Sequence, residues 1–320
     1  MRIKRNNVIR FLRNYRIGTL ILFRRIKKGF ANAVCAVTTT KGNYILKVAL
    51  RNNPVRVRYE VDLLCFLKNL PTPRPLLSCS RKYLLDFDST HKAFVYPMLA
   101  GRQHRHFTRP MLRQVGAFLG RYHRQSRRFR STVSRFEFYT ISPARFRRMV
   151  RRGARAPQPE VRRAIAYSAS VFPRYQLPSS LPTGAMHIDV KPENALFSSG
   201  RLRGIIDFDN AYQGPILLDL ANTMMWFCSG RGRFDLEGSL AIAQAYNAVR
   251  PLGTLERRSL FKAVHYAAVS HVLVDIDMML HGRHRLPLSY IRWGIKNLLE
   301  TERRLSFTRE EFDGMLGSNV

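Results

Sequence analysis

The chain has 320 residues, a length that allows one large domain or two lobes with an ample hydrophobic core. Apolar residues make up 45% of it and aromatic residues 11%, which is typical of a folded globular protein and excludes a disordered one. The 55 lysines and arginines exceed the 21 acidic residues by 34, so the protein should attract anions such as nucleotides, nucleic acid or anionic lipid.

The first third of the chain predicts a small antiparallel sheet. Apolar runs rich in β-branched residues are separated by turn residues such as Lys41-Gly42-Asn43. A later segment has the apolar spacing of a helix and stops at Pro71-Thr72-Pro73. The expected strands are Thr19–Arg25, Ala33–Thr39, Asn43–Ala49, Tyr83–Phe87 and Lys92–Tyr96, and the expected helices are Asn6–Tyr15 and Arg58–Leu70.

Beyond residue 98 the periodicity becomes mostly helical. The expected helices are Arg113–His123, Pro157–Ser168, Leu217–Phe227, Leu236–Ala248, Leu255–Leu280 and Tyr290–Leu305, with one short strand at Leu202–Phe208. A small sheet followed by a larger set of helices predicts the α+β class. Residues 1–98 and residues 99–320 are expected to form two lobes of one domain.

The cysteines indicate a reducing compartment. The sequence contains no C-x-x-C pair and no histidine cluster at metal-binding spacing. The thiols are therefore expected to be reduced and mostly buried in a cytoplasmic protein, without a disulfide framework or a zinc site. They belong to Cys35, Cys65, Cys79 and Cys228.

Two blocks concentrate the positive charge. Arg2–Lys28 contains no acidic residue, and Arg121–Arg163 includes the runs RQSRRFR and RFRRMVRRGAR. Either these blocks bind nucleic acid or anionic membrane, or they form a solvated basic face. The second interpretation is favoured, because no nucleic-acid-binding motif appears and the arginines do not alternate with aromatic residues. The sequence gives no indication of the oligomeric state.

The most informative stretch spans residues 186–211 and reads MHIDVKPENALF, SSGRLRG and IIDFDNA. It contains Asp189, then Asn194 five residues later, then Asp207 thirteen residues after that. Phosphoryl transfer needs a carboxylate that orients the attacking hydroxyl, and oxygen ligands that hold magnesium against the phosphates. We therefore predict that Asp189 is a catalytic base and that Asn194 and Asp207 are metal ligands.

Two further residues of this stretch have candidate roles. Asp209 would point to the same side as Asp207 if the strand continued, and would then be a further metal ligand. The alternative is a turn formed by Asp209 and Asn210. His187 is expected to be structural, with its ring bonded to backbone or to the Asp207 carboxylate.

A candidate phosphate anchor lies in the first lobe. Lys47 stands within an apolar strand, where a buried ammonium is costly unless it is paired, and Glu60 on the following helix is the natural partner. Such a pair can present the ammonium to the α- and β-phosphates of ATP. The alternative is an edge lysine that points to water. The turn at Gly29–Val34, which contains Asn32, could cover the phosphates with backbone N–H groups, although it lacks G-x-G-x-x-G.

With these residues in place, nearly the whole chain resembles one known superfamily. It is similar to the aminoglycoside phosphotransferases and choline kinases, which have a protein-kinase-like fold, and within that superfamily to the homoserine kinases. The specific motifs are H-x-D-x-x-x-x-N and I-D-F. Softer similarity is carried by NAVCAVTTTKGNYILKV, PTPRPL, PMLAGR, VGAFLGRYH, LLDLA and AQAYNAVRPL.

The resemblance implies an ATP- and magnesium-dependent kinase of a small-molecule hydroxyl. It implies a nucleotide-binding N-terminal lobe, a C-terminal lobe for catalysis and acceptor binding, and Asp189 as the base. Tyr96 and Met98 would belong to the hinge whose backbone meets adenine. Lys191 would contact the transferred phosphate, as the corresponding lysine does in protein kinases, whose motif is similar to HIDVKPEN. Asp219 looks like the structural aspartate of the family.

The best single acceptor implied by the resemblance is L-homoserine, phosphorylated to O-phospho-L-homoserine in threonine biosynthesis. The chain departs from that family in having Asp209 where an aromatic residue is usual. It also has MMWFC at Met224–Cys228 and SHVLVD at Ser270–Asp275 in place of the usual runs. A zwitterionic acceptor would need an anion for its amine, which Asp275 or Asp277 could supply, and an arginine for its carboxylate.

Other interpretations remain open at this point. The chain could be a kinase of another small alcohol or amino alcohol, a protein-kinase-like enzyme, or a non-catalytic basic module that binds nucleic acid or membrane. A protein kinase is less favoured, because D-F-D replaces D-F-G and the connection from Asp207 to the LLDLA segment is too short for an activation loop.

Overall fold

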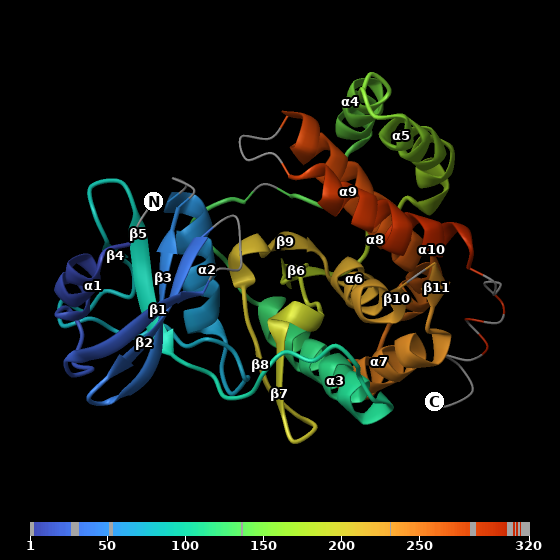
Figure 1. Cartoon of the computed structure of the whole chain (residues 1–320). Helices are drawn as coiled ribbons and strands as arrows, with labels where there is room; N and C mark the ends of the chain where they lie inside the picture. Colours follow the sequence, from blue (N-terminus) through green and yellow to red (C-terminus); the bar gives the residue numbers. More distant parts are fainter. Residues whose placement is uncertain are drawn as a thin grey trace.

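The computed structural model describes residues 3–26, 32–50, 54–135, 137–230, 232–281 and 286–305, together with Glu310, Phe312 and Gly314. Figure 1 shows a small part built on a sheet beside a larger part that is mostly helical. The α+β class predicted from the sequence is therefore confirmed.

The smaller part contains a five-stranded antiparallel sheet in the order β1-β2-β3-β5-β4. Every strand overlaps one of the predicted strands, and β3 occupies the centre of the sheet. The strands are β1 (Leu20–Ile26), β2 (Asn32–Thr39), β3 (Gly42–Ala49), β4 (Leu85–Asp86) and β5 (Lys92–Pro97).

One helix covers each face of this sheet. Successive side chains of a strand point to opposite faces, and Cys35 and Val37 pack in a small core with α1 (Arg5–Leu12). On the other face, Ile45 joins the main core of the molecule together with α2 (Pro54–Phe66). Figure 1 shows α2 between the sheet and the helical part, so this helix can carry residues from one part to the other.

The position of α2 differs from the prediction by one helical turn. The sequence predicts Arg58–Leu70, with Asn53-Pro54 as a break, whereas the helix runs from Pro54 to Phe66. Proline is well suited to the first helical position, because its missing N–H would have no partner there. Leu70 is buried all the same, but from the non-helical segment that follows the helix.

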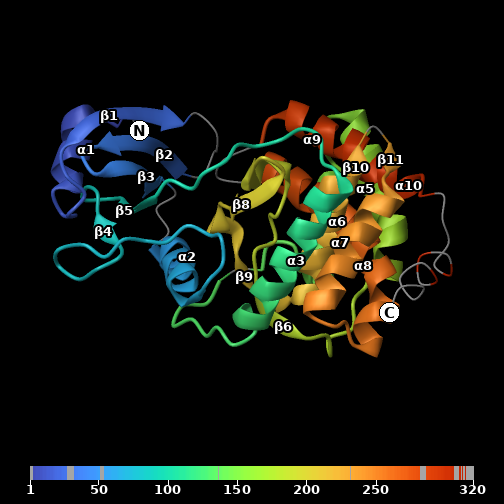
Figure 2. The ribbon, with the colours of Figure 1, turned by 90° about the horizontal axis from the view of Figure 1, so that it is seen from below.

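Five long helices of the larger part overlap those expected from the sequence. Figure 2 shows α3, α6, α7 and α8 packed against one another, and Thr254–His281 is the longest of them. That helix is long and apolar enough to cross a membrane, but 83% of its most apolar window is buried inside the protein. The helices are α3 (Arg109–Ser126), α5 (Pro159–Val171), α6 (Ile216–Cys228), α7 (Leu236–Val249) and α8 (Thr254–His281).

Several short elements were not predicted. The expected helix Tyr290–Leu305 is divided into α9 (Leu288–Gly294), a π-helical turn and α10 (Glu300–Arg303), and α4 (Pro143–Gly153) forms within the second basic block. Two strand pairs frame the informative stretch of the sequence. They are β6 (Thr183–Met186) with β9 (Tyr212–Pro215), and β7 (Ala195–Ser198) with β8 (Arg201–Ile205); β10 (Ser229–Gly230) and β11 (Arg233–Phe234) pair elsewhere.

Candidate active site

Asp219 on α6 fixes the loop between β6 and β7. Its Oδ2 and Oδ1 atoms accept the backbone N–H groups of His187 and Ile188, at 2.7 and 2.8 Å. Asn222, one turn further along α6, donates to the Ile188 carbonyl. Ile188 has a φ of +59°, a strained value for a β-branched residue, so these bonds hold it in a conformation that it would otherwise avoid. The structural role expected for Asp219 is thus visible in its contacts.

His187 ties the two segments of the informative stretch together. Its Nε2 donates to the Ile206 carbonyl at 3.1 Å, and its Nδ1 accepts the Asp189 N–H at 3.2 Å. Burial lowers its pKa below the ordinary value, although neighbouring carboxylates oppose this. A neutral ring with both nitrogens engaged is a structural group, as predicted, and its partner is backbone rather than the Asp207 carboxylate.

Asp189 follows directly and is buried within a set of donors. Its Oδ1 lies 2.9 Å from Lys191 Nζ, and Asn194 Nδ2 donates to its carbonyl at 2.8 Å and to its Oδ2 at 3.2 Å. Asn210 Nδ2 approaches the same Oδ2 at 3.4 Å. Burial raises the pKa of Asp189, and the Lys191 ammonium opposes the rise. The side chain is therefore held in one orientation while its basicity is increased.

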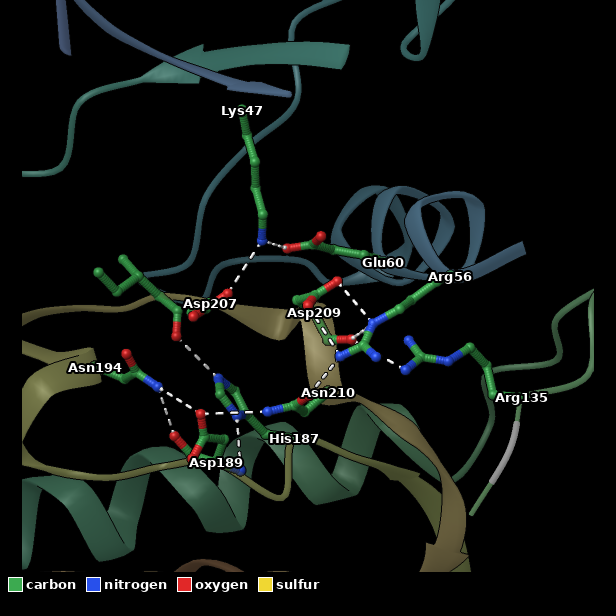
Figure 3. A network of polar contacts seen from close by, with 11 residues as sticks. Lys47, Arg56, Glu60, Arg135, His187, Asp189, Asn194, Asp207, Asp209 and Asn210 are labelled. Atoms are coloured by element: carbon green, nitrogen blue, oxygen red, sulfur yellow. Dashed lines mark hydrogen bonds and ion pairs between the residues drawn. The ribbon is translucent and has the colours of Figure 1, made fainter. Parts of the chain in front are cut away.

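The expected ion pair between Lys47 and Glu60 is present. Lys47 Nζ lies 2.7 Å from Glu60 Oε1 and 3.1 Å from Asp207 Oδ1, and the lysine side chain is only 5% exposed. Burial alone would lower the pKa of Lys47, but the Glu60 and Asp207 carboxylates raise it above its usual range. Figure 3 shows Lys47 reaching from the sheet toward Asp207, so a residue of the first part meets the second part here.

Asp209 occupies a different environment from Asp207. The Asp207 side chain is 49% exposed, whereas that of Asp209 is 9% exposed and forms an ion pair with Arg56 of α2. Arg56 Nε lies 3.0 Å from Oδ1, and its Nη2 lies 2.9 Å from Oδ2. Because the arginine bonds both carboxylate oxygens, the arrangement favours an ion-pair role for Asp209 over the metal-binding role expected for it.

The reason for the difference lies in the backbone. The predicted strand to Phe208 ends at Ile205, and Asp207 adopts a left-handed conformation with φ +67° before a short 3-10 turn, Phe208–Asn210. Side chains two residues apart share a face only in an extended strand. The turn with Asn210, which was the alternative interpretation of Asp209, is the arrangement that the structure contains.

The oxygen atoms of Asn194 and Asp207 fit a magnesium ion chemically. The Asn194 amide nitrogen bonds Asp189, and within the described ranges its Oδ1 has no hydrogen-bond partner. Lys47 bonds only Oδ1 of Asp207. The described residues contain no group of three or more His, Cys, Asp or Glu that could hold a metal. One carboxylate, one amide oxygen and substrate phosphates are a usual environment for magnesium, whereas a metal bound by protein groups alone is not expected here.

The other predicted nucleotide contacts are described in part. Asn32 is the first residue of β2, opposite Ala49, but most of the turn before it lies outside the described residues. Tyr96 is buried on β5, near enough to Lys47 for the lysine to influence its pKa. The Met98 N–H donates to the Asn43 carbonyl at 3.0 Å, so this hinge donor is engaged within the protein.

Helices α6 and α8 bring a further set of side chains to Lys191. The Lys191 ammonium lies 5.3 Å from the ring centroid of Trp226, which packs edge-on against His271 at 5.2 Å. Asp275, one turn beyond His271, is buried, and its pKa is raised to about 8 by burial, with Lys191 opposing the rise. The MMWFC and SHVLVD segments that depart from the homoserine kinase pattern therefore lie beside Lys191.

Sequence reasoning missed Arg56, Asn210 and Asn222 as parts of this network. Arg56 precedes Glu60 by four residues, a spacing that places both on one helix face. That signal was hidden because the predicted helix began too late. Asn222 follows Asp219 by three residues in the LLDLAN run, and the same helical spacing indicates that both side chains face the loop.

A two-part molecule with these groups where the parts meet has the protein-kinase-like fold, as predicted. Among solved structures, a microcompartment-associated aminopropanol kinase superposes with a TM-score of 0.70 over 98% of this chain and 99% of its own, at 16% identity. The amicoumacin kinase hAmiN has the same TM-score over 97% of each chain, at 13% identity. These likenesses concern the fold alone.

Residues 23–252 match the model of the phosphotransferase enzyme family, and the chain belongs to that family. Homoserine kinases are among its curated relatives. The one from Xanthobacter autotrophicus is 28% identical over 295 residues, which cover 88% of this chain and 90% of that protein. The one from Pseudomonas aeruginosa is 30% identical over 261 residues, covering 79% and 80%. The family predicted from the sequence is thus confirmed, and the protein is a phosphotransferase.

Proposed function

We propose that this phosphotransferase transfers the γ-phosphoryl group of ATP to the hydroxyl of a small molecule, with L-homoserine as the best single acceptor. The observation that supports this most strongly is the arrangement of Asp189, Asn194 and Asp207 around His187, with the Lys47–Glu60 pair reaching Asp207 from the sheet. Those groups match the requirements of phosphoryl transfer.

Asp189 acts as the base in this proposal. Its carboxylate accepts the proton of the acceptor hydroxyl as that oxygen attacks the γ-phosphorus and the bond from the γ-phosphorus to ADP breaks. The raised pKa favours that transfer, while Lys191 keeps the carboxylate ionised before it. Lys191 would also stabilise the charge that develops on the transferred group. Lys47, held by Glu60, binds the phosphates of the nucleotide.

Magnesium would be held by Asn194 and Asp207 and would neutralise charge on the phosphates. Tyr96 and the residues around Met98 would form the adenine side of the site. We assign Asp209 to Arg56 and not to the metal, because of the ion pair described above.

The acceptor side favours an amine-bearing molecule. Asp275 is a buried carboxylate without a hydrogen bond or ion pair in the described part of the chain, and it influences the pKa of both Tyr139 and Tyr290. A buried carboxylate of raised pKa is stabilised in its charged form by an incoming ammonium group. Homoserine carries such a group, and the curated relatives named above support it as the acceptor.

A protein acceptor is less well supported. Only Phe208–Pro215 separate Asp207 from α6, and half of that connection is the strand β9, paired with β6. The described cysteines are all free thiols, in keeping with the cytoplasmic location that we propose with this function.

The test is an ADP-release assay over homoserine, choline, aminoglycosides, methylthioribose and a protein substrate, with the phosphorylated product identified by ³¹P NMR. We expect homoserine to give the highest kcat/KM. Asp189→Asn should lower kcat by roughly 10²–10⁴-fold, the usual contribution of a positioned base, while MgATP binding measured by calorimetry is retained.

Two outcomes would contradict the proposal. If no acceptor stimulates ADP release by the wild-type protein, the assigned reaction is wrong. Near-normal turnover by Asp189→Asn would instead refute the role of Asp189 as the base.

A further inference from the structure

Two side chains, one turn apart on α2, reach the segment that carries Asp207. Glu60 acts through Lys47, which lies 3.1 Å from Asp207 Oδ1. Arg56 acts directly on Asp209. Figure 3 shows both connections descending from α2 and the sheet onto one short turn. The position of this helix is therefore linked to this segment at two points, the Asp207 side chain and Asp209.

The Arg56 connection has the geometry of a specific clamp. Its guanidinium binds the Asp209 carboxylate with two nitrogens, and Nε also donates to the Asp209 carbonyl at 3.0 Å. Arg135 donates to the same carbonyl at 3.0 Å, and the Arg56 guanidinium lies 5.1 Å from the ring centroid of Phe138. A paired, forked contact at a buried site fixes both distance and direction, which a single point charge does not.

The clamp continues to the base through Asn210. Arg56 Nη2 donates to Asn210 Oδ1. Because arginine has only donors, the amide oxygen of Asn210 must face it, and the amide nitrogen must therefore face the opposite way. That nitrogen approaches Asp189 Oδ2 at 3.4 Å. The orientation of Asn210, and with it one donor to the base, is set by a residue on the far helix.

The turn between the two anchors is strained. Asp207 has φ +67° and ψ +63°, values that non-glycine residues adopt at a cost of roughly 1 kcal/mol or more. Lys47 holds the side chain of Asp207, and Arg56 holds Asp209 two residues later. A strained backbone conformation persists only where surrounding contacts hold it in place. Here both of the contacts that hold it, from Lys47 and from Arg56, depend on α2.

We propose that Arg56 is a positioning residue that, through Asp209 and Asn210, controls one of the contacts that orient the base Asp189 and makes that contact depend on the placement of α2. This inference rests on the proposed function, in which Asp189 is the base. Through Glu60, α2 positions Lys47, and through Arg56 it contributes to the position of Asp189. A displacement of α2 would therefore misalign both the phosphate-binding lysine and the base.

The variant Arg56→Met tests this role, because it keeps the length of the side chain and removes its donors. We expect kcat to fall by roughly ten- to a hundredfold, the effect of a small misplacement of a catalytic group. The KM for ATP should change by less than about threefold, since the Lys47–Glu60 pair remains. Arg58→Met is the matched control: its side chain is 56% exposed and pairs with Asp62 on the same helix.

A double-mutant cycle separates positioning from general destabilisation. Asn210→Ala should lower kcat on its own, and adding it to Arg56→Met should cause little further loss, because both act through the same bond to Asp189. Arg56→Lys should restore part of the activity through its charge but not all of it, since an ammonium cannot bind Asp209 and Asn210 in a fork. Additive losses, or unchanged kcat in Arg56→Met, would overturn the proposal.

Hydrogen–deuterium exchange gives a readout that does not require turnover. Arg56→Met should speed amide exchange in residues 206–211 and also in residues 187–194, whereas Arg58→Met should change neither. Unchanged exchange in residues 187–194 would refute the link to the base. If the wild-type protein phosphorylates none of the acceptors, the proposed reaction fails, while this measurement still decides whether α2 controls the loop.

Discussion

Asp275 shows how a single buried group should govern the pH dependence of stability. Burial raises its pKa to about 8, against about 4 in an unfolded chain. The folded protein thus retains a proton that the unfolded chain releases over this interval, so this carboxyl stabilises the fold below pH 4 and that stabilisation is lost as the pH rises toward 8. Asp275→Asn cannot lose a proton. We expect its advantage in free energy of unfolding over wild type to grow between pH 5 and pH 9 in urea titrations.

Asp277→Asn, two residues further along α8, is the control for this prediction. Asp277 is partly exposed and lies 3.5 Å from Arg152, so its replacement should leave the pH profile close to that of wild type. A difference between Asp275→Asn and wild type that stays constant across the pH range would show that Asp275 has an ordinary pKa.

The residues whose placement the sequence predicted best are those that depend on local spacing or on a buried charge that needs a partner. Asp189, Asn194 and Asp207 lie around one loop, and Lys47 meets Glu60 because burial of a strand lysine demands a partner. Asp209 could not be assigned in this way. Its environment depends on a left-handed backbone at Asp207 and on an arginine 153 residues away, and neither is encoded in the spacing around it.

At the scale of elements, the close approach of α3 and α7 depends on Gly116. A Cβ atom at this position would overlap the Ile242 carbonyl oxygen of α7, which is backbone and has little room to move. Gly116→Ala should therefore force the helices apart and lower the free energy of unfolding, by roughly 1–3 kcal/mol as for other overpacked sites. Urea denaturation followed by circular dichroism would measure the change.

Gly294→Ala is the matched control, because a Cβ atom there would meet its nearest neighbour, Val272 Cγ2, at an ordinary 3.8 Å. Alanine favours a helix over glycine by up to about 1 kcal/mol, so this variant should be as stable as wild type or more stable. Equal effects of the two substitutions would show that the helix contact at Gly116 can relax.

Helices and strands with a periodic apolar face were predicted well from the sequence. Short strands that pair with a segment distant in the sequence were predicted poorly. The sheet and the long helices follow from local patterns. The pairs β6–β9 and β7–β8 consist of short strands whose stability comes from partners and surroundings, so their own sequences carry little signal. These pairs frame the loop that carries Asp189 and Asn194, so the sequence indicated the residues of the candidate site more clearly than the strands that position them.

At the scale of the molecule, the few acidic residues are unevenly distributed. Of the 21 acidic residues in the chain, several lie buried in or behind the candidate site. These are Glu60, Asp189, Asp209, Asp219 and Asp275. These buried carboxylates are not available to the surface, where the basic residues, which outnumber the acidic ones by 55 to 21 in the chain, are expected to repel one another. Structure and composition together indicate that repulsion between like charges lowers the stability of the folded protein.

This repulsion predicts that moderate salt stabilises the protein. Raising NaCl from about 20 to about 300 mM shortens the Debye length from roughly 20 Å to about 6 Å, so long-range repulsion between exposed arginines weakens while buried pairs such as Lys47–Glu60 are hardly screened. We expect the thermal midpoint, measured by calorimetry without nucleotide, to rise by a few degrees. Other salts whose anions bind proteins weakly should raise the midpoint as NaCl does. This comparison separates screening from specific anion binding at the candidate phosphate site. A midpoint that falls steadily with NaCl would contradict this prediction. It would mean that attraction within exposed ion pairs outweighs the repulsion between the basic side chains.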